Sequence, residues 1–169
     1  MRVFLLIVAL ILAGCSSKSS RAEKHRQSYE QHYHLIMDAE KHATPEGRKV
    51  LKVTRQMYLD KKIVRGACWD YLNTAYNKAG YPHAKRKRIY FESKRGPYAP
   101  TYLLQPGDWI YHINHGYHGV EHSGMFVAWI DRERKIALML SYAGERRSEP
   151  ARYKRYDLSS VYSIMRPSD

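Results

Sequence analysis

The sequence predicts an α+β domain, because candidate helices fill the first half of the chain and candidate strands follow one another through the second half. The chain has 169 residues, of which 44% are hydrophobic, so a single domain can bury a sizeable core without disulfide support. Only two cysteines are present, which excludes a disulfide scaffold and a cysteine-rich zinc module.

The start of the chain has the pattern of a secretion signal. Arg2 precedes an unbroken apolar run from Val3 to Ala13. This run is too short for a comfortable membrane span but has the length of a signal-peptide core. It ends in small residues directly before Cys15. Residues 1–14 are therefore expected to be a leader that is removed.

The segment 12–15, Leu-Ala-Gly-Cys, resembles the bacterial lipobox. The resemblance implies that Cys15 carries acyl chains such as palmitate, which anchor the protein in a membrane, and that residues 15–20 form a short polar tether. Ser16 after the cysteine is similar to Gram-negative lipoproteins sorted to the outer membrane. We expect a lipid-anchored protein of the cell envelope, which faces the periplasm from the outer membrane if the organism is Gram-negative.

A helical segment is expected over residues 21–65. Residues 21–43 are polar and permit a helix, with only a patchy apolar face. Thr44 and Pro45 then form a helix start, because a hydroxyl caps the free N–H groups and proline suits the first helical position. Apolar residues recur at helical spacing from there to about Leu59.

A further helix is expected from Gly66 or Ala67, with Cys68 in its first turn. Its apolar side chains share one face because they follow the spacing i, i+4, i+7, i+8 and i+11. They are Cys68, Leu72, Ala75, Tyr76 and Ala79. Gly80 is placed to end this helix. The basic stretch 83–105 that follows is expected to be a loop.

The pattern becomes that of β-strands after residue 105. A Pro-Gly-Asp turn at 106–108 introduces the first of several short apolar runs, which are separated by polar loops. The expected strands are 109–112, 122–130, 136–142 and 161–165, with a charged hairpin turn at 131–135.

Cys68 and His122 are the candidate catalytic pair. The N-terminus of a helix carries a partial positive charge, which favours the anionic thiolate, the nucleophilic form of cysteine. His122 opens an apolar strand, from which its imidazole can be held against a thiol on a neighbouring helix. Each residue also has a plain structural alternative: Cys68 as a small core residue, and His122 as a strand-edge residue.

Three motifs in this order resemble the NlpC-type cell-wall peptidases, papain-like cysteine enzymes of bacterial peptidoglycan. The motifs are Cys68 at a helix start, Pro106-Gly107-Asp108 before a strand, and His122-Ser123-Gly124-Met125-Phe126. They span about 66–142. The resemblance implies a papain-like domain over 66–169, in which Cys68 is the nucleophile and His122 the base. It also implies that peptide bonds in peptidoglycan stem peptides are cut by acyl transfer without a cofactor.

The chain departs from that family around the nucleophile and at the third catalytic position. The family usually has an aspartate before the cysteine and a small residue after it, where this chain has Ala67 and Trp69. The family's third residue, often a histidine, would fall near 139–142, where none is found. Ser141 is the expected substitute, whose hydroxyl would orient His122.

Histidines crowd the segment 112–122, at positions 112, 115, 118 and 122. Imidazoles at such spacing can bind zinc, but no cysteine pair accompanies them, so we expect a polar loop that lines a cleft and no metal. Within this loop His118 is expected to contact substrate, together with Trp69 and Asp70 at the helix start.

The strongly basic composition bears on the partner. Lysine and arginine total 29 against 16 acidic residues, a formal charge of +13. Nucleic acid is the usual partner of such a chain, but the leader directs this one outside the cytoplasm, so anionic wall polymers or lipid head groups are expected instead. We expect peptidoglycan as partner, a membrane contact through the lipid anchor, no nucleic acid, and a monomer.

The leading hypothesis is therefore a lipid-anchored cysteine peptidase of peptidoglycan. A non-catalytic wall-binding lipoprotein on the same fold stays open, because the residues around Cys68 are altered and the third histidine is missing. A thiol amidase or acyltransferase acting on another envelope amide stays open as well.

Overall fold

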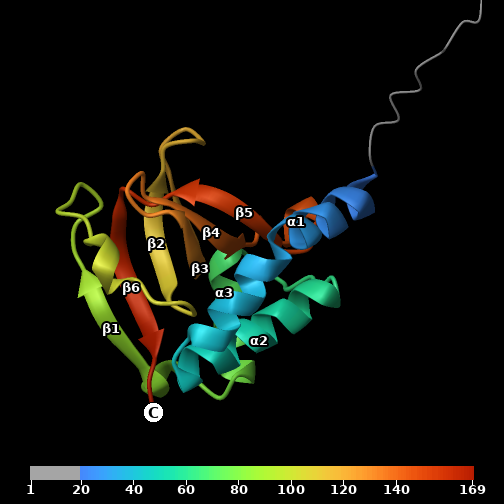
Figure 1. The fold of residues 1–169 in the computed structure, drawn as a ribbon, viewed down its shortest axis with the longest axis horizontal. Coiled ribbons are helices and arrows are strands. Elements are labelled where there is room, and N and C mark those ends of the chain that lie inside the picture. The colour runs from blue at the N-terminus through green and yellow to red at the C-terminus, as the bar shows by residue number, and fades with distance from the viewer. Residues whose placement is uncertain (1–19) are drawn as a thin grey trace, which may run out of the picture.

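The computed structural model describes residues 20–169, so the expected leader and the lipidation of Cys15 lie outside the described residues. Within them the chain is an α+β fold, in which three α-helices cover one face of a six-stranded antiparallel sheet (Figure 1). The helices are α1 (Arg21–His42), α2 (Pro45–Leu59) and α3 (Cys68–Lys78). The strands are β1 (Arg86–Phe91), β2 (Trp109–Asn114), β3 (Val120–Asp131), β4 (Ile136–Ser141), β5 (Arg152–Asp157) and β6 (Val161–Pro167).

Short polar contacts fix where the helices begin. The Thr44 hydroxyl accepts a hydrogen bond from the Gly47 N–H at 3.1 Å, which confirms the predicted start of α2. At α3 the Asp70 carboxylate accepts from the Ala67 N–H at 2.7 Å and so caps the turn that carries Cys68. None of the described helices is long and apolar enough to cross a membrane.

The strands lie in the order β1-β6-β2-β3-β4-β5, so β1 and β5 form the two edges. The predicted strands are confirmed as β2, β3, β4 and β6. The prediction of a loop throughout 83–105 is wrong, because Arg86–Phe91 pairs with β6, and β5 was not predicted either. Both edge strands carry runs of basic residues, which turn toward solvent and hide the apolar alternation that identifies the inner strands.

Each face of the sheet carries its own apolar core. The helix-side core joins α1, α2 and α3 to one face, and the described side chains that fill it include Ile36, Ala39, Leu72, Trp109, Met125, Leu138 and Leu140. The opposite core lies under the segment 99–104 and includes Leu104, Ile110, Phe126, Ala137, Met139 and Ile164. Because α1 and α2 contribute to the same core as the sheet, residues 21–65 are part of one folded unit with residues 66–169.

A buried ion pair ties β2 to β6. Asp108 is 1% exposed and accepts two hydrogen bonds from the Arg166 guanidinium, both at 2.8 Å. It also accepts from the Gln105 N–H, which closes the turn before β2. The aspartate of the predicted Pro-Gly-Asp turn therefore has a structural role.

Candidate functional site

Cys68 is the first residue of α3, with a free and half-buried thiol. The helix lies on the helix-side face of the sheet, where the Tyr71 ring stacks on Tyr142 with ring centroids 4.7 Å apart. The loop before it is held by the Glu145 N–H, which donates to the Gly66 carbonyl at 2.9 Å. These contacts place the thiol beside the end of β4, above the helix-side face.

His122 points to the opposite face of the sheet. Along β3 the side chains of His122, Gly124 and Phe126 share one side, and Phe126 belongs to the opposite core. A Cβ on Gly124 would lie 2.3 Å from the Met139 Cε, which is in the same core. The His122 ring lies near residues of this side as well, and stacks on Tyr156 with ring centroids 5.4 Å apart.

The structure therefore does not bring Cys68 and His122 together. No hydrogen bond within the described residues joins the sulfur to the imidazole, and the His122 Nε2 is buried without a hydrogen-bond partner there. The expected catalytic pair of Cys68 and His122 is therefore wrong about which side of the sheet the His122 side chain faces. Alternation along β3 turns the histidine away from α3, so the sheet separates the two groups.

Ser141 does not orient His122 either. Its hydroxyl lies 2.9 Å from the Tyr156 hydroxyl, with which it shares a hydrogen bond. Ser141 and His122 do share one face of the sheet, and Tyr156 contacts both. The sequence thus predicted two neighbours of a cluster on the opposite face, but not the tyrosine that links them.

The second member of that cluster is His112, which pairs with His122 across β2 and β3. Their ring centroids are 5.7 Å apart. Burial lowers the pKa of His112 to about 3, and burial followed by the charges of Lys154 and Arg152 lowers the pKa of His122 to about 4. Both imidazoles are therefore neutral at pH 7, inside an apolar and cationic setting.

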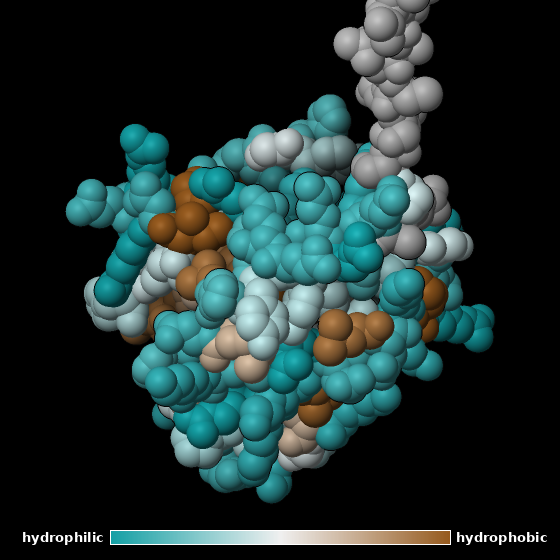
Figure 2. All heavy atoms as spheres, turned by 45° about the vertical axis from the view of Figure 1, so that its right-hand side comes forward, coloured by the Kyte–Doolittle hydropathy of each residue, from teal (hydrophilic) through white to brown (hydrophobic). Residues whose placement is uncertain are grey.

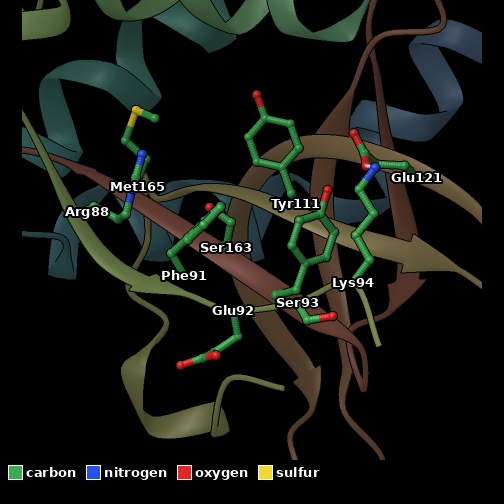
Figure 3. A pocket seen from close by; sticks show the side chains of 10 residues that line it. Arg88, Phe91, Glu92, Ser93, Lys94, Tyr111, Glu121, Ser163 and Met165 are labelled. Carbon is green, nitrogen blue, oxygen red and sulfur yellow. Dashed lines mark ion pairs between the residues drawn. The ribbon is translucent and has the colours of Figure 1, made fainter. Parts of the chain in front are cut away.

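The helix-side face has an open cleft where the helices do not cover β1, β6 and β2. Its volume is about 640 Å³, and Figure 3 shows the side chains that surround it. They are Arg88, Phe91, Glu92, Ser93, Lys94, Tyr111, Glu121, Tyr162, Ser163 and Met165. Apolar, aromatic and charged groups of both signs converge here, which is typical of a ligand site.

The polar wall of this cleft is organised by Glu121. Lys94 forms an ion pair with its carboxylate, drawn as a dashed line in Figure 3. The hydrogen bond from Lys94 lowers the pKa of Glu121, and the Tyr162 hydroxyl adds a second one. The carboxylate is therefore held ionised at the edge of the cleft.

Cys68 lies within electrostatic range of the cleft. Burial raises the pKa of Tyr111 to about 12, and Cys68, when ionised, adds to this rise. Cys68 acts in the same way on Tyr156, outside the cleft. In the cleft, burial also raises the pKa of Tyr162, followed by Glu121, Tyr111 and, as the smallest cause, Cys68. Both phenols are protonated at pH 7, so they can donate hydrogen bonds but cannot take a proton from the thiol.

A row of aromatic rings leads from the start of α3 into the cleft. Trp69 is 46% exposed, and its ring centroid lies 5.8 Å from that of Trp109. Trp109 stacks near Tyr111 at 6.0 Å, and Tyr111 lies 6.2 Å from Tyr162. Trp109 is fully buried, so Trp69 at one end and the cleft residues Tyr111 and Tyr162 at the other are the rings of this aromatic row that can meet a ligand.

The three residues expected to contact substrate have different places. Trp69 lies at the outer end of the aromatic row. The Asp70 carboxylate faces its own helix start, where it caps the Ala67 N–H. His118 lies in the exposed turn between β2 and β3, next to Tyr117, and does not line the cleft.

The described residues hold no cluster of three or more histidine, cysteine or acidic side chains arranged to bind a metal. His112 and His122 are a pair on the opposite face, while His115 and His118 extend into an exposed turn.

Sequence reasoning missed the residues that form the cleft, above all Tyr111, Tyr162 and Arg88. The signal for Tyr111 was present, because Trp109 and Tyr111 alternate on one side of a predicted strand. Arg88 carried no such signal, since its strand was taken for a loop.

Comparison with known proteins found no match for the chain, neither among protein-family models nor among curated proteins or solved structures.

Proposed function

We propose that this chain is a lipid-anchored envelope protein that binds peptidoglycan fragments in the cleft beside Cys68 without cutting them. The observation that carries this proposal is the separation of the cleft from the only predicted base. Tyr111 and Tyr162 line the cleft, whereas His122 lies on the other face of the sheet. A thiol without a proton acceptor gives a binding site rather than a hydrolase.

The chemistry of the cleft suits a wall peptide with its attached sugar. Arg88 supplies a cation for a carboxylate, and the exposed pair of Lys94 and Glu121 can exchange its partners for the charges of a peptide. Tyr111 and Tyr162 in the cleft, with the exposed Trp69 at the outer end of the row, provide surfaces for the apolar faces of sugar rings and peptide groups. The basic character of the whole chain favours the same anionic polymer.

The test is calorimetric binding of soluble muropeptides released from purified sacculi. Tyr111→Ala removes the central ring of the aromatic row and should weaken binding about tenfold or more, as loss of an interfacial aromatic anchor does. Tyr102→Ala is the matched control, because Tyr102 is 71% exposed and does not line the cleft. Equal weakening by both variants, or by neither, would contradict the proposal.

A thiol hydrolase is the second candidate, because Cys68 is free and accessible at a helix start next to the cleft. Mass spectrometry of the same muropeptides after incubation distinguishes the two functions. Intact fragments support binding alone. Cleavage that disappears in Cys68→Ala would establish the hydrolase, and would require that a group other than His122, as placed here, takes the proton.

A further inference from the structure

A second surface, which shares no residue with the lining of the cleft, lies at the start of α1, near Cys15 in the sequence. The cap of α1 is Ser20, only five residues after Cys15. Five residues span about 17 Å at most when fully extended. Lipidation of Cys15 would therefore hold the first turns of α1 close to the membrane that contains the acyl chains.

The end of α2 and the segment after it lie beside the start of α1. The His25 ring stacks on Tyr58 with ring centroids 4.0 Å apart, and the Tyr58 hydroxyl donates to the His25 carbonyl. The following segment is fixed at Val64, whose carbonyl accepts from the Tyr142 hydroxyl at 2.8 Å. The two regions thus form one continuous and firmly held surface.

This membrane-proximal surface combines exposed cations with exposed apolar side chains. Arg26, Leu59 and Lys61 line one shallow hollow here, and their neighbours in the chain Lys24, Lys62, Ile63 and Arg65 are exposed as well. Leu59 is 43% and Ile63 40% exposed. The face drawn in Figure 2 is mostly hydrophilic, with several separate hydrophobic patches. With two exposed apolar side chains among five cations, charge is the main feature of the docking surface.

Three acidic residues, Glu23, Glu30 and Asp60, lie among these cations in the sequence. Glu23 accepts a hydrogen bond from the Ser20 N–H, Asp60 accepts from the Gln56 side chain, and Glu30 pairs with Arg26 at 3.5 Å. Hydrogen bonds from neutral groups leave the charges of Glu23 and Asp60 in place, so five cations stand beside three carboxylates and the surface keeps a net charge of +2. Exposed ion pairs such as that of Arg26 exchange readily for other anions.

We infer that this surface docks on the anionic phospholipid head groups of the membrane that anchors the chain. The inference rests on the lipid anchor included in the proposed function, and not on the peptidoglycan cleft. Cations near a negatively charged bilayer are attracted within a Debye length, and Leu59 and Ile63 are placed to enter the interface between them. The cleft then has a fixed orientation relative to the membrane.

The test measures co-sedimentation of the mature chain carrying Cys15→Ser with lipid vesicles at low salt. Vesicles of phosphatidylcholine alone are compared with vesicles that contain about 30% phosphatidylglycerol. Binding to the anionic vesicles only is the expected result. In Lys61→Gln/Lys62→Gln it should fall about 30-fold, since each cation near such a surface contributes roughly a factor of five.

The matched control is Arg132→Gln/Lys135→Gln, which removes two exposed cations from the β3–β4 turn, at the far end of the strands from Val64. It should leave vesicle binding within twofold. Equal loss in both double variants, or equal binding to neutral and anionic vesicles, would overturn the inference. So would loss of sacculus retention instead of vesicle binding in Lys61→Gln/Lys62→Gln, which would assign the surface to a wall polymer. Muropeptide binding to the cleft serves as an independent measurement.

Discussion

The two faces of the sheet differ in how closely their polar side chains are packed. On the helix side, tyrosines and charged groups surround an open cleft of about 640 Å³. On the opposite side, His112, His122, Ser141 and Tyr156 are packed together, and the Nε2 atoms of both histidines are buried without hydrogen-bond partners in the described residues. His112 is fully buried and His122 half-buried, so this group is packed more closely than the cleft.

This difference shows that the same residue types have different consequences on the two sides. A histidine beside a cleft can exchange protons, whereas one buried in an apolar core stays neutral and contributes to how stability varies with pH. The side of the sheet, set by strand register, decides between these roles.

The largest expected effect comes from breaking the buried ion pair between Asp108 and Arg166, which holds the sheet that both faces belong to. Arg166→Ala leaves the Asp108 carboxylate buried without its two guanidinium hydrogen bonds and should cost about 3–5 kcal/mol of unfolding free energy. Urea denaturation measures it. Arg134→Ala, which removes an exposed pair with Asp131, is the control and should cost less than about 0.5 kcal/mol. Similar costs in the two variants would refute a special role of the buried pair.

The next largest effect concerns how the free energy of unfolding depends on pH, through His122 on the opposite face. Because the folded pKa of His122 is about 4 against an ordinary 6.5, the unfolded chain binds the proton first. The contribution of His122 to the free energy of unfolding is therefore fully present above pH 6.5. It is lost as the pH falls toward 4, and the loss amounts to about 3 kcal/mol at most. His122→Gln should remove that part of the loss in unfolding measured at several pH values. His83→Gln, at an exposed position, should not change it.

The helices and inner strands were predictable because each carries a local signal. Thr44 and Pro45 mark a helix start by themselves, and β3 and β4 show long apolar runs around a charged turn. The edge strand Arg86–Phe91 has no such signal, since its place depends on pairing with Ser163–Pro167, far later in the chain. The composition of a short segment does not reveal which distant strand it pairs with.

The candidate site was predictable in its parts but not in its assembly. The sequence identified Cys68 at a helix start and His122 on a strand, and both positions are confirmed. Their separation depends on which side of β3 faces α3, and shifting the register by one residue would reverse it. An apolar run such as 124–128 has no alternation from which that side can be derived.

The smallest expected effect concerns the edge of the cleft. Lys94→Ala should change the unfolding free energy by less than about 0.5 kcal/mol, because its pair with Glu121 is largely exposed. The pKa of Glu121 should nevertheless rise, since the hydrogen bond from Lys94 is the main cause of its lowering. Titration followed by NMR measures that pKa, and an unchanged value would contradict the ion pair drawn in Figure 3.

The separation of Cys68 from His122 is tested most directly by a second thiol at position 122. In the mature chain with Cys15→Ser and His122→Cys, two cysteines remain, and a disulfide requires their Cα atoms to lie within about 7 Å. Mild oxidation of the folded monomer, followed by mass spectrometry, should leave both thiols free because the sheet lies between them. An intramolecular disulfide formed in high yield would contradict the account and restore the pair as a candidate catalytic centre.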